Sequence, residues 1–140
     1  MTKKYKIIAQ FIKDMSSETP DIETYIFVND YISKYQLNID INSKAIKDKM
    51  IEVNTILKFE DKQNNKKKSY FEINYSTIIK IEEEIKEREA LEKIILCEVQ
   101  VEIYPKIEKS LLNLLHNSGY PNVKFEKKVD FEQLYNQRLN

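Results

Sequence analysis

Apolar and polar side chains alternate along three segments in the first half of the chain. A period of two residues is typical of a β-strand with one buried face and one wet face. The alternating segments are residues 35–41, 51–59 and 69–81, and the last ends irregularly enough for 77–81 to be a separate fourth strand. Polar connections at 42–48 and 61–68 favour an antiparallel meander, and Asn64-Asn65 is a candidate for left-handed backbone in the second connection.

The first 20 residues have a mixed pattern. Their apolar side chains recur at helical spacing, yet the stretch is equally compatible with an extended chain; they are Ile7, Ile8, Phe11, Ile12 and Met15. A short helix is predicted next, because Thr19-Pro20-Asp21 combines a cap, a proline at the first helical position and an acid near the positive end of the helix dipole. We expect the face that carries Ile22, Tyr25, Ile26 and Ile32 to be buried.

The second half of the chain has helical periodicity. Acids at 82–84 mark a helix start, and apolar residues from Ile85 to Val99 follow at spacings of three and four. Pro105 is expected to break or kink this helix near Tyr104, so that a second helix runs to the Gly119 cap. A final short helix follows Asp130. Strands followed by helices predict an α+β fold with helices on one face of an antiparallel sheet.

Composition narrows the possible functions. The chain has 140 residues, 41% of them hydrophobic, which suits one domain with one core. A single Gly excludes a P-loop and a dinucleotide-binding turn, and one Cys with one His excludes a disulfide framework and Cys/His zinc sites. Zero formal net charge argues against nucleic-acid binding. No apolar run is long enough for a transmembrane helix, so a cytoplasmic protein is the default expectation.

The residues that could carry catalysis are better explained without it. His116 reads as a surface residue at a helix end, Cys97 as a buried thiol, and the abundant glutamates as a solvated helix face. We therefore predict no enzyme activity, metal or cofactor. Fifteen aromatic residues, nine of them Tyr, suit an interaction surface, and open sheet edges favour oligomerisation. The residues alone thus predict an oligomeric α+β binding module.

A set of short motifs, weak singly, carries a resemblance through its order and spacing. They lie at 10–20, 37–40, 50–53, 71–79, Tyr104-Pro105, Gly119-Tyr120-Pro121 and 129–139. In these motifs the chain resembles the bacterial protein-export chaperone family SecB over nearly its full length. The resemblance implies a single SecB-like domain over 1–140, with a four-stranded antiparallel sheet, two long C-terminal helices and a short terminal helix packed on one face.

The function implied by the resemblance is that of an export chaperone. It would hold unfolded precursor proteins without ATP in hydrophobic surface grooves and deliver them to the motor SecA, as a homotetramer built as a dimer of dimers, with no membrane insertion. By position, Asp14, Glu18, Tyr70 and Glu72 correspond to the family's SecA contacts. Tyr104, Leu134 and Tyr135 are the candidates for the client groove.

Two alternatives stay open at this level. The chain could be a SecB-like chaperone dedicated to one partner, such as a toxin–antitoxin pair, or an unrelated structural oligomer. Asp14, Glu18 and Glu72 favour the export chaperone. The main departure is charge, because members of the resembled family are usually markedly acidic and this chain is neutral owing to its lysines.

Overall fold

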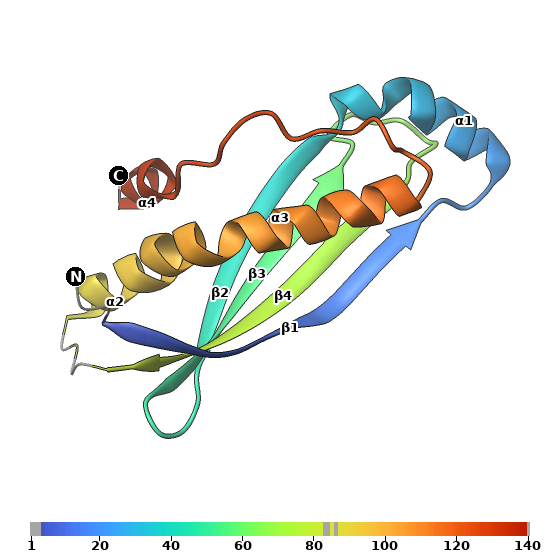
Figure 1. Cartoon of the computed structure of the whole chain (residues 1–140). Coiled ribbons are helices and arrows are strands. Elements are labelled where there is room, and N and C mark those ends of the chain that lie inside the picture. The colour runs from blue at the N-terminus through green and yellow to red at the C-terminus, as the bar shows by residue number, and fades with distance from the viewer. Residues whose placement is uncertain (1–3, 83–84, 86, 140) are drawn as a thin grey trace.

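The computed structural model of the chain contains a four-stranded antiparallel sheet with helices on one face, as predicted (Figure 1). The structure describes residues 4–82, 85 and 87–139. The strands are β1 (Tyr5–Glu18), β2 (Gln36–Ala45), β3 (Met50–Glu60) and β4 (Tyr70–Ile81). Their order in the sheet is β1-β4-β3-β2, so β1 and β2 are the two edge strands.

The ambiguous N-terminal stretch is strand β1, which pairs with β4. Its register shifts twice, between Ile7 and Ala9 and between Ile12 and Asp14. Each such bulge adds one residue and reverses which side chains face the helices, so a strand with two bulges can imitate helical spacing. The strand that joins the three predicted from alternation to complete the sheet is therefore β1. The possible separate strand at 77–81 is wrong, because those residues continue β4.

The two connections differ from the sequence expectation in detail. The 42–48 connection is shorter than expected, because β2 continues to Ala45. Its turn contains Asp48 and Lys49, with φ of 61° and 63°. The 61–68 segment is a connection, as expected. Left-handed backbone at Asn64-Asn65 is wrong, since the positive φ values within the described residues lie at Asp48, Lys49 and Gly119.

Helix α1 (Ile22–Tyr31) forms where expected and is followed by a 3-10 turn at Ile32–Lys34. Its cap is Asp21, whose carboxylate accepts the Thr24 backbone N–H at 2.8 Å, so the expected cap at Thr19 is wrong. The expected face is only partly buried: Tyr25 and Ile32 pack against the core, whereas Ile22 and Ile26 are 62% and 58% exposed. The fully buried residues of this helix are Thr24 and Val28.

Tyr25 accounts for this orientation of α1. Its hydroxyl donates to the Gly119 carbonyl oxygen at 2.7 Å, and its ring lies 5.3 Å from that of Tyr120. These contacts with the segment after α3 bring Tyr25 and the adjacent Thr24 and Val28 side of the helix inward. Ile22 and Ile26 are left on the opposite, solvent side, although they are the more apolar residues.

The long helical region runs without a break from α2 (Arg88–Lys93) through a π-helical segment (Ile94–Glu98) into α3 (Val99–Asn117). Pro105 lies inside α3, so the expected division into two long helices there is wrong. Pro105 has no N–H for the Val101 carbonyl, but Val101 lies on the exposed side of the helix. Of the expected helix start at 82–84, residues 83–84 lie outside the described residues, and Glu82 and Ile85 precede α2.

The predicted end of the long helix at Gly119 and the predicted start of the last helix at Asp130 are both confirmed. α3 stops at Gly119, which has a φ of 103°, and the Tyr120 N–H bonds to the Leu115 carbonyl oxygen at 3.0 Å. Helix α4 (Phe131–Leu139) starts at Asp130, whose carboxylate accepts the Gln133 N–H at 3.0 Å. Between them, the segment that crosses from α3 to α4 is extended over one end of the sheet (Figure 1).

The core lies between α3 and one face of the sheet. Buried apolar residues of α3 recur every three or four positions and pack on the alternate residues of β3 and β4; they include Ile103, Ile107, Leu111 and Leu115 on the helix and Leu57, Phe71, Ile73 and Ile79 on the strands. The opposite face of the sheet, termed here the outward face, carries the intervening residues of each strand. Within the described part of the chain no helix covers it (Figure 1).

Candidate binding surfaces

The four acidic and aromatic residues predicted for partner docking lie together on the outward face. The second bulge of β1 places Asp14 opposite Asn74, and Glu18 lies opposite Tyr70. Glu72 shares this face, two residues along β4 from Tyr70. One surface at the β1–β4 junction thus combines residues that are more than 50 positions apart in the sequence.

Glu72 is held by contacts on both carboxylate oxygens. The Tyr70 hydroxyl donates to Oε2 at 2.8 Å, and Lys58 Nζ lies 3.7 Å from Oε1. Lys58 is directly opposite Glu72 in the β3–β4 register. Partial burial, followed by the Glu72 hydrogen bond and the nearby charges of Glu72, Glu60 and Glu18, raises the pKa of Tyr70 to about 12. The hydroxyl is therefore a stable donor that orients Glu72.

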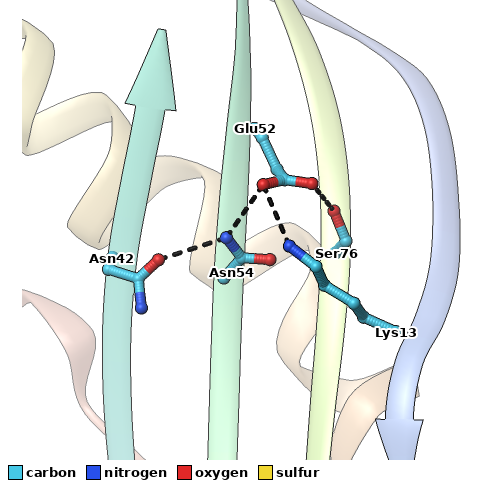
Figure 2. Close-up of polar contacts among 5 residues, drawn as sticks. All are labelled: Lys13, Asn42, Glu52, Asn54 and Ser76. Atoms are coloured by element: carbon cyan, nitrogen blue, oxygen red, sulfur yellow. Dashed lines mark hydrogen bonds and ion pairs between the residues drawn. The ribbon is translucent and has the colours of Figure 1, made fainter.

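A second carboxylate, Glu52, is the centre of a polar network across the outward face (Figure 2). It accepts hydrogen bonds from Asn54 at 3.1 Å, from Ser76 at 3.1 Å and from Lys13 at 3.2 Å. Asn54 also donates to Asn42 at 3.1 Å, so the network reaches all four strands. These contacts, the Asn54 hydrogen bond foremost, lower the pKa of Glu52.

Lysines neutralise much of the acidic charge on the outward face. Besides Lys13–Glu52 and Lys58–Glu72, Lys62 lies 3.0 Å from Glu60 and lowers its pKa. Asp14 and Glu18 are exposed, and neither forms an ion pair within the described residues. On the outward face, therefore, some carboxylates are neutralised by lysines, and, among the described residues, Asp14 and Glu18 keep an unpaired negative charge.

A pocket of about 190 Å³ lies beside the free edge of β2. It is formed by β2, the π-helical segment and α4, through Ile39, Asp40, Ile41, Leu96, Phe131, Leu134 and Tyr135. Leu134 is 44% exposed, whereas Tyr135 is buried and its hydroxyl donates to the Glu89 carbonyl oxygen at 3.2 Å. The pocket therefore has a mainly apolar lining with one acidic residue, Asp40, and Leu134 is its most exposed apolar side chain.

The three groove candidates have different environments. Leu134 and Tyr135 line the pocket, and Tyr104 does not. Tyr104 is buried in α3 with its ring 5.0 Å from that of Phe131, which does line the pocket. Burial, with the adjacent Glu108 carboxylate, raises the pKa of Tyr104. Its side chain supports the wall of the pocket from behind.

Sequence reasoning missed several residues of these surfaces. Leu96 lines the pocket because the π-helical segment shifts the helical spacing before α3. The apolar periodicity of the sequence does not predict that shift. Lys58 and Glu52 occupy outward positions that strand alternation does identify. Their partners, however, depend on the register of β3 against β4 and on the bulges in β1.

The remaining candidates for chemistry have structural roles. Cys97 is buried and its burial raises the thiol pKa, while His116 Nε2 lies 3.0 Å from the Val123 carbonyl oxygen. Among the described residues no group of three or more His, Cys, Asp or Glu is placed to hold a metal ion. None of the described helices is long and apolar enough to cross a membrane.

Comparison with known proteins places these surfaces in context. The model of the family described as preprotein translocase subunit SecB matches residues 1–140. A Pelagibacter ubique protein provisionally named as protein-export protein SecB is 61% identical, with all of both chains covered. Protein-export protein SecB of Rhodospirillum centenum is 24% identical over 94% of this chain and 77% of its own.

Among solved structures, the Mycobacterium tuberculosis SecB-like chaperone Rv1957, in complex with a ChAD peptide from the HigA1 antitoxin, has a similar fold. The TM-score is 0.65 with 12% sequence identity, and the match covers 90% of this chain and 91% of that one.

Proposed function

Because the chain belongs to the SecB family of protein-export chaperones, we propose that it holds unfolded precursor proteins without ATP and delivers them to the motor SecA. The observation that carries the holding function is the apolar pocket beside edge strand β2. Its place of action is the cytoplasm, where precursors are synthesised.

The pocket and the β2 edge together suit clients of unrelated sequence. In the sheet β2 pairs with β3 alone, so one row of its backbone groups faces away from the sheet. An extended client segment can bond to such an edge through main-chain groups, which every sequence has. Apolar client side chains would then enter the pocket against Leu134, Phe131 and Ile41.

The holding function is tested by suppression of the aggregation of a slowly folding precursor. The wild-type chain should suppress it, and Leu134→Asp should weaken suppression several-fold, because a carboxylate in an apolar pocket loses hydration when a client binds. Ile22→Asp is the matched control, since Ile22 is also an exposed aliphatic residue but lies on α1.

A wild-type chain without suppression would overturn the holding function. Equal loss in both variants, with both folded, would instead move the client site away from the pocket. Client range separates the general holdase from a chaperone dedicated to one partner. A general holdase suppresses aggregation of several unrelated precursors, whereas a dedicated one protects a single partner.

Docking of SecA is assigned to the outward face at Asp14, Glu18, Tyr70 and Glu72. Asp14 and Glu18 are exposed and Glu72 is partly exposed, and carboxylates on an uncovered sheet face suit a partner that presents basic side chains. Glu72→Gln should weaken SecA binding and leave client holding unchanged. It is a cleaner change than Glu72→Lys, which would place two lysines directly opposite each other at the Lys58 register position.

The control for docking is Glu23→Gln, which removes the same charge from exposed α1. Binding to SecA is measured by titration calorimetry. Loss of client holding together with SecA binding in Glu72→Gln would mean that Glu72 has a structural role, and unchanged SecA binding would remove it from the docking site.

Assembly as a dimer of dimers is part of the proposal. Edge strand β1 carries four apolar side chains that are each 45–47% exposed, namely Ile8, Phe11, Ile12 and Met15. An edge strand with this much exposed apolar surface is a hazard in a monomer and is normally covered. We therefore assign β1 to one subunit interface, which joins two chains; the proposed dimer of dimers, a particle of four 16.8 kDa chains, needs a second interface as well.

A further inference from the structure

Within the described residues, Lys58 is the cation that lies within ion-pair distance of a docking-site carboxylate. Its Nζ lies 3.7 Å from Glu72 Oε1 across the β3–β4 ladder, and its side chain is 44% exposed. Tyr70 holds the other carboxylate oxygen at 2.8 Å. Glu72 is thus fixed in place by Tyr70, and on its other oxygen it faces a cation that belongs to its own chain.

This pairing divides the docking site into two parts. Asp14 and Glu18 on β1 are open carboxylates without an ion pair in the described part of the chain. Glu72 on β4 has its counter-charge on the neighbouring strand. A basic side chain of a partner can approach the β1 acids directly, but at Glu72 it must compete with Lys58.

The ion pair contributes little to folding, because its Nζ–Oε1 distance is 3.7 Å and its side chains are 44% and 22% exposed. Exposed pairs contribute about 0–1 kcal/mol to stability, since water screens both charges. The same lysine acts differently on a docking partner, because a second cation brought up to Glu72 is repelled by Lys58 and the shared carboxylate is partly neutralised before contact. Lys58 therefore weakens the attraction at this position while hardly changing the fold.

From this geometry we infer that Lys58 is a specificity-determining residue of the docking face, which attenuates binding of a basic partner at Glu72. The inference rests on the proposed docking of SecA to this face. The residue makes docking an exchange of ion pairs, in which Lys58 gives up Glu72 to a cation of the partner. The affinity of the complex is then limited by Lys58, because Lys58 is positively charged like the basic side chain of the partner.

The experiment measures SecA binding to the full-length chain with Lys58→Met, which keeps an unbranched stem and removes the charge. The expected result is about threefold tighter binding, the size of one exposed ion-pair interaction. Lys44→Met is the matched control, because it removes the same charge from an exposed strand residue. Lys44 lies opposite Glu52, far from Glu72 along the sheet. The control should change binding little.

A double-variant cycle isolates the contact. In a Glu72→Gln background the gain from Lys58→Met should disappear, because the carboxylate that Lys58 neutralises is gone. Equal gains from Lys58→Met and Lys44→Met would overturn the inference and indicate only a net-charge effect. Weaker binding in Lys58→Met would also overturn it, because Lys58 would then contact the partner directly. Absence of SecA binding by the wild-type chain would refute the proposed docking itself, which is a separate result.

Discussion

At the scale of single residues, the core between α3 and the sheet encloses a polar pair. Thr55 on β3 and Gln100 on α3 are both completely buried. Gln100 Nε2 donates to the Thr55 hydroxyl at 2.9 Å, and that hydroxyl lies 3.2 Å from Gln100 Oε1. A buried polar group is tolerated when it has a partner and is costly without one. The pair therefore fixes the position of α3 along β3.

Removal of one partner should be more destabilising than removal of both. Gln100→Leu leaves the Thr55 hydroxyl buried and unpaired and should lower the free energy of unfolding by about 1–3 kcal/mol. Adding Thr55→Val should recover part of that loss, because it removes the orphaned hydroxyl. Urea unfolding of both single variants and the double variant measures the coupling. Strictly additive losses would mean that the pair acts through packing alone.

At the scale of elements, the register of strand β1 depends on contacts with the neighbouring strands. Its two bulges decide which residues point outward, and the Lys13–Glu52 ion pair ties the second bulge to β3 across β4 (Figure 2). The apolar spacing of β1 is ambiguous in sequence for the same reason, since bulges break the period of two. Asp14 and Glu18 reach the docking face only because β1 has this register.

Glu52→Gln tests this tie through its pH dependence. The folded state lowers the pKa of Glu52 below its ordinary value of 4.5, so the carboxylate stabilises the fold above that pH. The stabilisation is lost as the pH falls through the lowered pKa. The stability difference between wild type and Glu52→Gln should therefore be largest at neutral pH and shrink below about pH 4.5. Urea midpoints at pH 7, 5 and 3 measure it, and a pH-independent difference would contradict the assignment.

At the scale of the whole molecule, the described exposed apolar residues are grouped on β1 and on α1, and the two groups have different meanings; Ile46, Val101 and Leu134 are exposed singly. Those on β1 follow a free sheet edge that can pair with another chain, whereas Ile22 and Ile26 lie on α1, which has no unpaired backbone row. A sheet edge offers main-chain hydrogen bonds in addition to apolar contact, and a helix surface offers only the second. Subunit contact is therefore expected at β1.

A charge placed on β1 should dissociate the assembly without unfolding the chain. Ile12→Glu puts a carboxylate on the exposed edge, where burial in an interface would leave it unpaired. The expected result is a smaller particle in sedimentation velocity, with an unchanged circular dichroism spectrum. Ile26→Glu on α1 is the control and should keep the wild-type mass. Equal masses for both variants would move the interface away from β1.

Much of the fold could be predicted from local pattern. Neighbouring residues determine the alternation in β2, β3 and the start of β4. They also determine the glycine stop of α3 and the Asp130 cap, so the local sequence predicts all of these features. The helix break at Pro105 was not correctly readable, because a proline is tolerated where the freed carbonyl lies on the exposed side. The exposure of Ile22 and Ile26 on α1 also depends on a tertiary contact, since the Tyr25 hydrogen bond with Gly119 spans 94 positions.

The sequence by itself determined the class of the molecule: an α+β fold with helices on one face of an antiparallel sheet, and the ordered motifs of the SecB family. Only the tertiary structure decided which charges are open and which are paired. Asp14 and Glu18 face outward because of a bulge, and Glu72 meets Lys58 because of strand register. Both properties depend on how distant strands align, and a shift of one residue reverses every side chain of a strand.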